Sequence, residues 1–378
     1  DVVAGTNKTL FWICSNCSNE WGAKGSTRTR HGCGYCIGRG SNKLHSDGRN
    51  SMRILVTGGA GFIGSHLVRR FVDNYKNYFI INLDKLTYAA DFKNIEDLDE
   101  KSNYSFIHGD LCDANLINDV FQKFPIDSII HLAAESHVDN SIKNPLNFIN
   151  TNILGTVNLL EATRKYWLDS SKKYLFYNIS TDEVYGSLGK QGFFTEHSSY
   201  SPNSPYSASK ASADHFIRAY GKTYNLPFII SNCSNNYGPH QHIEKLIPMT
   251  IKNIQEKQKI PIYGTGDSIR DWIFVLDHVD AMEIIFHNGK NGETYNIGSN
   301  NEWKNLVLVH KICDLIDDKL GTINSKDLIS FVSDRPGHDK RYAIDSSKIM
   351  NELLWRPKYS MNEGLRLTID WYLSNPPG

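Results

Sequence analysis

The chain has 378 residues, and its 41 lysine and arginine residues balance 41 aspartate and glutamate residues, so its formal net charge is zero. A chain of this length can build two or three domains, and nothing in its overall charge points to a nucleic-acid or membrane partner. No apolar run approaches the roughly 20 residues that span a bilayer, and no signal-peptide pattern opens the sequence, so we expect a cytoplasmic protein.

Residues 1–40 hold four of the seven cysteines, arranged in two C-x2-C pairs with fifteen residues between them. This spacing is typical of a structural zinc site, in which four thiolates close a tetrahedron around the metal. A module of about forty residues cannot build an adequate core alone, so the metal would supply its folding energy. The predicted zinc ligands are Cys14, Cys17, Cys33 and Cys36.

The stretch LFWICSNCSNEWGAKGSTRTRHGCGYCIGRG around these cysteines resembles the zinc-ribbon, treble-clef-like modules of some bacterial and large-virus proteins. Two functions stay open for it. Its basic residues Lys24, Arg28, Arg30 and Arg39 could contact nucleic acid. Alternatively, the module is structural or contacts protein, and its basic side chains are simply solvated. We favour the second interpretation.

Residues 41–51, SNKLHSDGRNS, are polar and lack apolar periodicity, which predicts a linker. From Met52 onward, short apolar runs alternate with longer amphipathic segments, as in βαβ units around a parallel sheet. The predicted fold class is therefore α/β. We expect a Rossmann-type doubly wound sheet over residues 52–232 and a smaller α/β substrate domain formed mainly by residues 233–378, with some later segments alternating between the two.

Six strands are predicted in the first of these regions, at residues 53–57, 78–84, 104–110, 128–134, 173–180 and 228–234. A helix is predicted from about Phe62, a second after Pro145, where proline suits the first turn, and a third over residues 206–224.

A glycine-rich turn, TGGAGFIG, follows the first predicted strand and opens the first predicted helix. Gly58, Gly61 and Gly64 would let backbone N–H groups approach a pyrophosphate at the positive end of that helix. Asp84 ends the second strand, twenty residues after Gly64, and could accept hydrogen bonds from an adenosine ribose. Because a carboxylate there would repel a 2′-phosphate, the sequence favours NAD over NADP.

The segment YSASK places Tyr206 and Lys210 four residues apart on one helix face. A free phenol has a pKa near 10, but a nearby ammonium favours the phenolate. We therefore expect Lys210 to lower the pKa of Tyr206, so that Tyr206 can take a hydroxyl proton while a hydride leaves the same carbon. The alternative is an ordinary surface pair.

Adjacent carboxylates stand at the end of the fifth predicted strand, in the segment STDEVYG. Asp182 and Glu183 are costly to bury, and close carboxyl groups push each other's pKa values apart. One could then act as an acid while the other acts as a base. The alternative is a turn residue with a structural partner.

Residues from Met52 to about Leu373 resemble the dTDP-glucose 4,6-dehydratases, which are extended short-chain dehydrogenases/reductases. The resemblance rests on TGGAGFIG, NLDKLTYA, HLAAESHVDNSI, STDEVYG, PYSASKASADH, NCSNNYGP, EKLIP, PIYGTGDSIRDW and DRPGHDKRYAID. It implies deoxysugar biosynthesis, such as that of rhamnose, and a homodimer formed through the helices after Pro145 and from Tyr206.

The same resemblance implies individual catalytic roles. Tyr206 would deprotonate the sugar O4 while hydride passes from C4 to NAD, and Lys210 would support it. Glu183 would then remove the C5 proton, and Asp182 would protonate the departing 6-hydroxyl. Thr181 would hydrogen-bond the sugar or its ketone.

The resemblance also implies two sets of binding residues. Besides the three glycines, Tyr206 and Lys210, the residues expected to contact NAD are Phe62, Ile63, Asp84, Lys85, Leu86, Thr87, Asp110, Leu111, Leu132, Ala133, Ala134, Thr151 and Asn236. Those expected at the nucleotide-sugar substrate are Ser136, Thr181, Asn235, Lys245, Leu246, Pro261, Ile262, Tyr263, Arg270, Asn305, Asp334, Arg335 and His338. Arginine suits the substrate diphosphate because its planar fork donates two hydrogen bonds, and Tyr263 could stack on a pyrimidine.

One loop departs from the family pattern. Before EKLIP the family usually has an aromatic residue and a proline, whereas this chain has His240, Gln241, His242 and Ile243. Because the loop should lie beside the nucleotide, the choice between dTDP-glucose and UDP-glucose stays open. A single thymine methyl contributes only about 1–3 kcal/mol of discrimination in a pocket.

Two other functions were weighed against the dehydratase. A UDP-sugar 4-epimerase of the same fold would not need Asp182 or Glu183, so their presence argues against it. A zinc-module nucleic-acid-binding protein that only senses NAD would not need the intact set of Tyr206, Lys210 and the two carboxylates.

Overall fold

The computed structural model describes residues 9–13, 20–24, 52–169, 171–321, 324–334 and 337–375. Within the first two ranges, β1 (Thr9–Ile13) and β2 (Glu20–Lys24) form an antiparallel pair in which Thr9 lies opposite Lys24. The four cysteines predicted to bind zinc lie outside the described residues.

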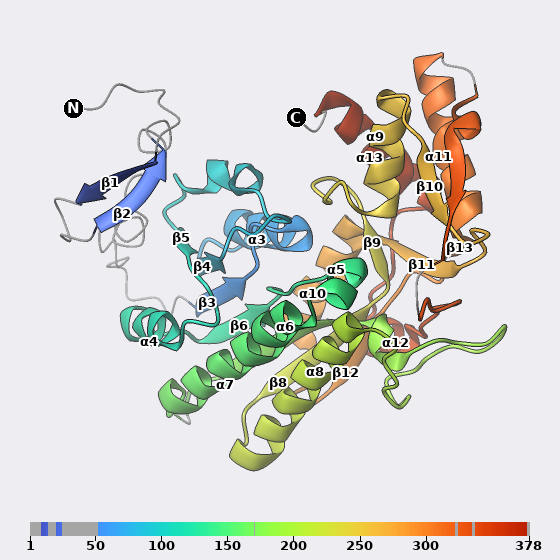
Figure 1. The fold of residues 1–378 in the computed structure, drawn as a ribbon. Helices are drawn as coiled ribbons and strands as arrows, with labels where there is room; N and C mark the ends of the chain where they lie inside the picture. The colour runs from blue at the N-terminus through green and yellow to red at the C-terminus, as the bar shows by residue number, and fades with distance from the viewer. Residues whose placement is uncertain are drawn as a thin grey trace.

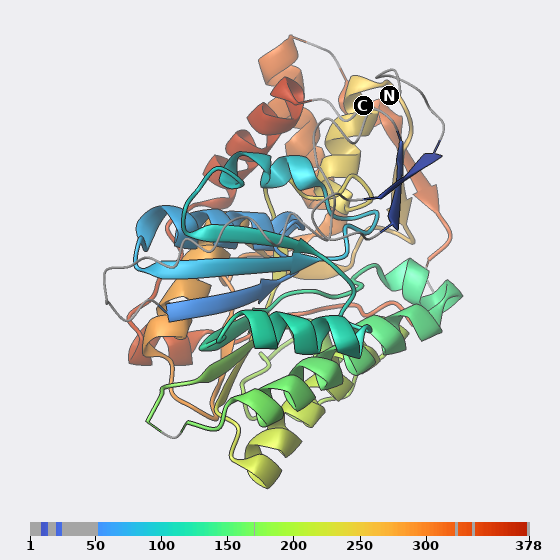
Figure 2. The ribbon, with the colours of Figure 1, turned by 90° about the vertical axis from the view of Figure 1, so that its left-hand side faces the viewer.

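The main feature of the described chain is a parallel sheet of seven strands (Figures 1 and 2). Each neighbouring pair in it runs parallel. In sheet order the strands are β12 (Thr294–Ile297), β8 (Phe228–Cys233), β7 (Leu175–Thr181), β6 (Ser128–His131), β3 (Met52–Thr57), β4 (Tyr78–Asp84) and β5 (Tyr104–His108). This order confirms the predicted Rossmann-type fold class, and all six predicted strands are present.

Two predicted strands end earlier than the apolar pattern suggested. β6 stops at His131 and β5 at His108, so Leu132–Ala134 and Gly109–Asp110 are loop residues. The seventh strand, β12, was not predicted, because its four residues lie in a stretch of mixed pattern. It comes from far along the chain and lies beside β8 (Figure 1).

Helices cover both faces of this sheet (Figure 2). On one face, α4 (Ala114–Lys123), α7 (Gly155–Tyr166) and α8 (Pro205–Tyr224) contribute to one apolar core; on the other, α3 (Phe62–Asn74) and α10 (Val275–Asn288) contribute to a second. Two short helices, α5 (Val138–Lys143) and α6 (Pro145–Phe148), precede a π-helical turn, η3 (Ile149–Leu154), that continues into α7.

Short 3-10 helices lie in the loops of the described chain. They are η1 (Phe92–Asn94), η2 (Glu96–Leu98), η4 (Asp182–Tyr185) and η5 (Ser325–Leu328). Among the described residues, no helix combines the length and the apolar composition that crossing a membrane requires.

The rest of the later chain builds two small sheets with their own helices. One sheet has the order β13 (Glu302–Lys304), β11 (Ile269–Phe274) and β9 (Asn235–Tyr237), and the other pairs β10 (Ile260–Tyr263) with β14 (Ile329–Val332). Their helices are α9 (Leu246–Gln255), α11 (Asn305–Leu320), α12 (Ser347–Glu352) and α13 (Met361–Ser374). We propose that these elements form the substrate domain, while β12 and α10 complete the Rossmann layer.

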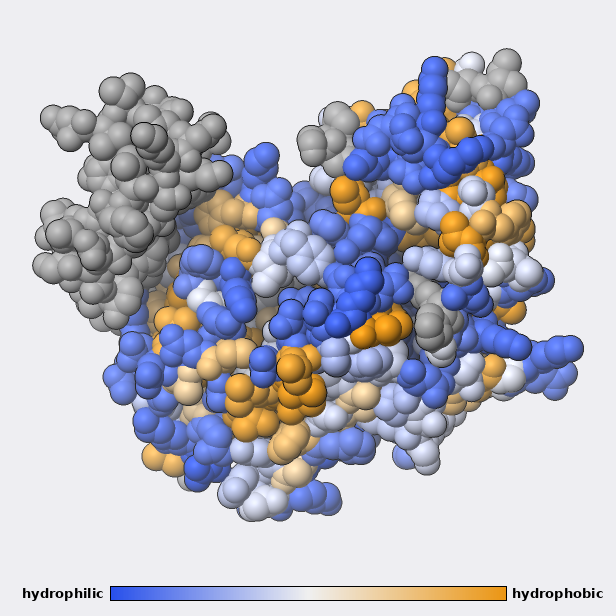
Figure 3. Space-filling view, in the orientation of Figure 1, coloured by the Kyte–Doolittle hydropathy of each residue, from blue (hydrophilic) through white to orange (hydrophobic). Residues whose placement is uncertain are grey.

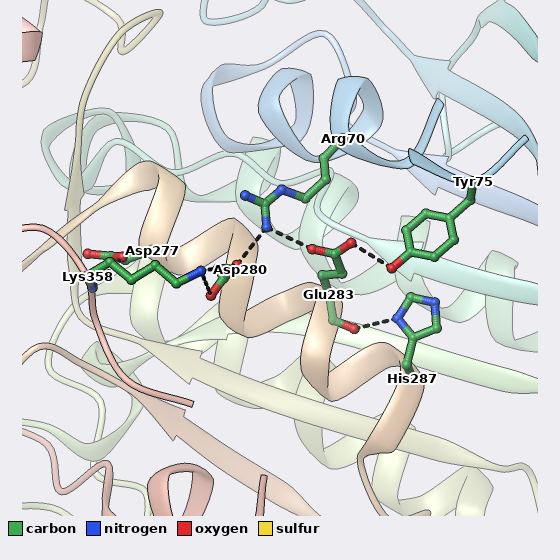
Figure 4. Close-up of polar contacts among 7 residues, drawn as sticks. All are labelled: Arg70, Tyr75, Asp277, Asp280, Glu283, His287 and Lys358. Carbon is green, nitrogen blue, oxygen red and sulfur yellow. Dashed lines mark hydrogen bonds and ion pairs between the residues drawn. The ribbon is translucent and has the colours of Figure 1, made fainter. Parts of the chain in front are cut away.

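A polar network ties α3 to α10 on the outside of the sheet (Figure 4). The Arg70 guanidinium donates to Asp280 Oδ1 at 2.9 Å and to Glu283 Oε2 at 2.7 Å, and the Tyr75 hydroxyl donates to Glu283 Oε1 at 2.7 Å. Lys358 also contacts Asp280. The N-terminus of α3 lies at the glycine-rich turn. The network therefore fixes the position of the helix that follows this turn.

The partly buried Arg70 contacts should contribute measurably to stability. We expect Arg70→Met to lower the free energy of unfolding by about 1–3 kcal/mol, since two charge-assisted hydrogen bonds are lost. Urea unfolding followed by circular dichroism would measure it. Lys101→Met, which removes an exposed pair with Asp73, is the matched control and should change stability by less than about 0.5 kcal/mol. Equal effects of the two substitutions would contradict this assignment.

Candidate functional site

A cleft of about 310 Å³ opens along the carboxyl ends of the parallel strands. The predicted catalytic residues Thr181, Asp182, Glu183, Tyr206 and Lys210 all line it. So do the predicted cofactor residues Gly58, Gly61, Phe62, Ile63, Gly64, Asp84, Lys85, Thr87, Asp110, Leu111, Leu132, Ala133, Ala134, Thr151 and Asn236. Leu86 is absent from these walls, but its backbone N–H donates to Asp84 Oδ1 at 2.8 Å.

The glycine-rich turn has no space for side chains at two of its glycines. Gly58 has a φ of +76°, and a Cβ there would lie 2.6 Å from the Ala133 nitrogen. A Cβ on Gly64 would lie 2.1 Å from the Gly58 carbonyl oxygen. Gly58, Gly61 and Gly64 all line the cleft at the start of α3, where free N–H groups and the helix dipole favour an anion.

Asp84 is 7% exposed, and both of its carboxylate oxygens already accept hydrogen bonds from the protein. Ala60 N–H donates to Oδ2 at 2.9 Å and Leu86 N–H donates to Oδ1. Burial raises the pKa of Asp84, and the two backbone donors act against that rise. Each carboxylate oxygen has a second lone pair, so Asp84 can shape the turn and still accept from a ribose hydroxyl.

The end of β7 carries the two carboxyl groups. Thr181 caps the turn η4, and its hydroxyl accepts a hydrogen bond from Glu183 N–H at 3.3 Å. Asp182 is 2% exposed, and within the described chain its Oδ2 has no hydrogen-bond partner. Burial first, and then the neighbouring Glu183 and Asp271 carboxylates, raise the pKa of Asp182 well above its ordinary value. A carboxyl group in this environment favours its neutral, proton-donating form.

Tyr206 and Lys210 line the same cleft from α8, but their electrostatics differ from the sequence-based expectation. Burial and the Glu183 carboxylate raise the pKa of Tyr206 well above 10, although a hydrogen bond with Thr181 acts in the opposite direction. The Lys210 ammonium donates to the Ile179 carbonyl oxygen at 2.8 Å rather than to the phenol. The expected lowering of the pKa of Tyr206 is therefore not met in this structure, because burial and the nearby Glu183 carboxylate both raise it.

Only part of the predicted substrate set lies in the cleft. Ser136, Asn235 and Lys245 join Thr181 in its walls, and the Lys245 ammonium donates to the Ser136 carbonyl oxygen at 3.1 Å. Tyr263, Asp334 and His338 form a separate group: the rings of Tyr263 and His338 meet edge to face, and His338 Nδ1 lies 2.6 Å from Asp334 Oδ1. Arg335 lies outside the described residues.

The remaining predicted substrate residues lie outside the cleft walls. Arg270 is buried, donates to the Ile269 and Asp339 carbonyl oxygens at 2.8 Å, and stacks on the Tyr342 ring. Ile262 packs in the apolar core, whereas Leu246 and Pro261 are partly buried. Asn305 opens α11, and its Oδ1 is buried with no partner among the described residues.

The side chains of the unusual loop before α9 lie in two different environments, one outside the cleft walls and one in them. His240 has a φ of +68° and is not among the cleft-lining residues. Its Nδ1 lies 2.6 Å from Asn94 Oδ1, and its ring contacts the Trp371 ring at a tilt of 52°. Gln241 and His242 line the cleft, and the ring of His242 meets Tyr88 edge to face. Sequence reasoning did not place these two in the site, nor Glu135, Ser180, Cys233, Ser234 and Glu244, which also line it.

Comparison with known proteins settles the family. Residues 55–368 match the family described as "GDP-mannose 4,6 dehydratase". The chain belongs to this 4,6-dehydratase family. Residues 1–39 match a second family, described as "Probable Treble clef zinc finger domain", as the cysteine spacing predicted.

Two similar proteins within the 4,6-dehydratase family are both dTDP-glucose 4,6-dehydratases. The dTDP-glucose 4,6-dehydratase of Salmonella typhimurium is 50% identical over 338 residues, which cover 86% of this chain and 93% of that protein. The crystal structure of Bacillus anthracis dTDP-glucose 4,6-dehydratase in complex with NAD is 46% identical, covers 86% of this chain and 97% of that one, and has a TM-score of 0.76.

The fold alone does not separate a dehydratase from an epimerase. The Thermotoga maritima UDP-glucose 4-epimerase structure with UDP-glucose also gives a TM-score of 0.76, at 28% identity, with 86% of this chain and 100% of that one covered. The difference in identity favours the dehydratases, in agreement with the Asp182–Glu183 pair at the end of β7.

The close backbone approach at Gly64 predicts a strong effect of one methyl group. Gly64→Ala should lower the free energy of unfolding by about 1–3 kcal/mol, because the new Cβ overlaps the Gly58 carbonyl and the turn must shift. Thermal unfolding would measure the loss. Gly189→Ala is the control, since a Cβ there meets nothing within 4 Å, and it should leave stability within about 0.5 kcal/mol. A Gly64→Ala variant as stable as the control would rule out this packing.

Proposed function

We propose that this chain is an NAD-dependent hydro-lyase that converts dTDP-glucose to the 4-keto-6-deoxyglucose nucleotide and water. The observation that carries the proposal is the buried Asp182 beside Glu183 in a cleft that also presents Tyr206, Lys210 and a side-chain-free glycine turn. Relatives that are half identical and described as dTDP-glucose 4,6-dehydratases support the same reaction.

The cleft residues fit NAD. Gly61 lines the cleft at the start of α3, and a Cβ there would meet only the Gly58 carbonyl oxygen at 3.4 Å, so the glycine leaves the backbone N–H groups open to a pyrophosphate. Asp84 lies where an adenosine ribose would be recognised, and Ala133 and Ala134 leave room at the other end. When bound, NAD accepts the hydride from the sugar C4 and returns it to C6.

The proton transfers fall to three side chains. Tyr206, in its ionised form, would accept the O4 proton as hydride leaves C4, so that C4 becomes a ketone and the C5 proton becomes acidic. Glu183 removes that C5 proton, and Asp182 donates its proton to the 6-hydroxyl, which leaves as water. Asp182 suits the acid role because burial and the neighbouring Glu183 carboxylate raise its pKa and so favour its protonated form.

We infer that the sugar nucleotide extends from this cleft toward the group formed by Tyr263, Asp334 and His338. Lys245 lies in the cleft wall and could meet the diphosphate, while Tyr263 offers a ring for the base. Gln241 and His242 replace the residues usual in this loop, so they are the side chains we expect to affect the choice between thymine and uracil.

For the N-terminal module we propose a structural zinc ion held by Cys14, Cys17, Cys33 and Cys36. The family match over residues 1–39 supports it, and a site closed by four thiolates leaves no open position for catalysis. The module would then act as a structural or protein-contact element beside the enzyme, with nucleic-acid binding through its basic residues as the alternative.

The reaction is tested by incubating the purified protein with dTDP-glucose and, separately, with UDP-glucose in deuterated water. Mass spectrometry should show the loss of one water and the gain of one deuterium, which enters from the solvent when C5 is reprotonated, with faster turnover of dTDP-glucose. Faster turnover of UDP-glucose would change the assigned nucleobase from thymine to uracil. Conversion to a galactose nucleotide without loss of water would overturn the dehydratase and indicate an epimerase.

Two variants test the carboxyl roles within the same assay. Asp182→Asn and Glu183→Gln should each lower kcat by about 10²–10⁴-fold, the usual contribution of a general acid or base. Because Glu183 is the residue proposed to remove the C5 proton, only Glu183→Gln should also abolish deuterium exchange at C5. Exchange that survives in Glu183→Gln and disappears in Asp182→Asn would reverse the two roles.

We also propose a homodimer through α6, α7 and α8. Apolar residues gather over α6 and α7 in the space-filling view (Figure 3). The exposed side chains on this face include Leu146, which is 69% exposed, together with Ile149, Leu154 and Phe216. A contiguous exposed apolar patch of this kind is typical of a protein–protein interface.

Charges placed in this patch should separate the subunits. We expect the native protein to have twice the chain mass by light scattering, and the double variant Leu146→Asp/Phe216→Asp to have the mass of a single chain. Leu354→Asp is the control, because Leu354 is 81% exposed but lies outside these helices, and it should stay dimeric. A native protein with the mass of one chain would contradict the proposed dimer.

A further inference from the structure

We propose that Asp214 is a positioning residue for the reaction: its buried carboxylate holds Lys210 as an ammonium and fastens the catalytic end of β7 to α8. This inference rests on the proposed function, because it needs Tyr206 and Lys210 to act in catalysis. Asp214 does not line the cleft, so it would act through its neighbours and not by touching the substrate.

Three side chains donate hydrogen bonds to the Asp214 carboxylate, which is 0% exposed. Asn178 Nδ2 donates to Oδ1 at 2.8 Å, and the Ser180 hydroxyl donates to Oδ2 at 2.7 Å. The Tyr200 hydroxyl donates to Oδ2 at 3.0 Å. All three donors are neutral, so hydrogen bonding alone does not explain why a charged group is buried here.

The position of these donors links the two catalytic elements. Asn178 and Ser180 alternate along β7, so both side chains point to the same side of the strand. Ser180 directly precedes Thr181, and Asp214 lies one helical turn after Lys210 on α8. The carboxylate therefore joins the strand that presents Asp182 and Glu183 to the helix that presents Tyr206 and Lys210.

Asp214 and Lys210 lie one helical turn apart on α8 and are both buried, and they attract each other without forming an ion pair in the described chain. Lys210 is 5% exposed, and its ammonium donates to a backbone carbonyl oxygen, which carries no formal charge. Burial lowers the pKa of Lys210 and attraction to Asp214 raises it, whereas burial raises the pKa of Asp214 and attraction to Lys210 lowers it. Each group thus stabilises the charged form of the other in a dry environment, where such attraction is strong.

Other titratable groups surround this pair from every packed element. Arg218 lies on α8 and attracts Asp214, and Tyr200 is hydrogen-bonded to both. Cys233 on β8 interacts with Lys210, as does His131 on β6, whose pKa burial lowers to about 3, so that it stays neutral. Tyr185, in η4, interacts with Asp214 but has its own pKa raised by burial. Lys210 and Arg218 are therefore the two basic groups whose attraction acts on Asp214.

The test is the pH dependence of kcat for Asp214→Asn, which keeps the shape but removes the charge. The Lys210 ammonium would lose its counter-charge, so the pKa of Lys210 would fall. The alkaline loss of activity would then begin at a lower pH than in the native enzyme. We expect this limb of the profile to move down by about 1 unit or more, with kcat at pH 7.5 at least tenfold lower and KM for the sugar nucleotide within about twofold.

Two controls separate this effect from a loss of stability. Asp277→Asn removes another buried carboxylate, one that accepts from Lys358 and Tyr359 N–H groups away from the cleft, and should lower stability without moving the pH profile. Tyr200→Phe removes one donor to Asp214 but keeps its charge, and should also leave the profile in place. An unmoved profile in Asp214→Asn, or an equal shift in Asp277→Asn, would overturn the proposal.

A second measurement does not depend on the variant folding. Nuclear magnetic resonance of ¹³Cε-labelled lysine in the native enzyme, with the signal assigned through Lys210→Met, should show Lys210 charged at pH 7.5. A neutral Lys210 at that pH would overturn the proposal even if Asp214→Asn is inactive. A native enzyme without dehydratase activity would instead overturn the proposed function, so the two failures are distinguishable.

Discussion

The catalytic cleft depends on a difference in environment between two adjacent carboxyl groups at the end of β7. Asp182 is almost fully buried and its Oδ2 has no hydrogen-bond partner in the described chain, whereas Glu183 is only partly buried. Burial and mutual repulsion both favour a proton on Asp182. An acid and a base can therefore occupy successive positions in the chain and still carry different charges at one pH.

The parallel sheet is what makes this difference useful. Parallel strands all end at the same edge, so the glycine turn after β3, Asp84 at the end of β4 and the carboxyl pair at the end of β7 meet in one cleft. Helix α8 then packs beside β7 and adds Tyr206 and Lys210. Asp214 joins these two elements with a single buried carboxylate, so the geometry of the acid, the base and the phenol is held by one set of contacts.

Local sequence patterns were sufficient for the elements whose chemistry is local. The six strands, the glycine turn and the helical spacing of Tyr206 and Lys210 depend on short-range periodicity, and all were predicted correctly. β12 was missed, because four residues carry too little pattern and only the tertiary pairing with β8 defines the strand. The roles of the site residues in binding and catalysis stay predictions.

Other features depend on contacts that a sequence does not display. The Lys210 ammonium reaches Ile179, and burial dominates at Tyr206, so the sequence-based direction for the pKa of Tyr206 was wrong for this structure. Arg270 donates to two backbone carbonyl oxygens and stacks on Tyr342, contacts that the sequence does not display, and its role at the substrate stays a prediction. Asp214 gave no signal at all, because a helical aspartate shows its importance only when β7 is packed against it.

The central claim is that Asp182 is a neutral acid at the pH at which its neighbour is a base. Infrared difference spectroscopy of the native enzyme and its Asp182→Asn and Glu183→Gln variants tests this directly. At pH 7 we predict a protonated-carboxyl C=O band that is lost in Asp182→Asn and kept in Glu183→Gln. If the band is absent from the native enzyme, or is lost only in Glu183→Gln, the assignment of acid and base is wrong.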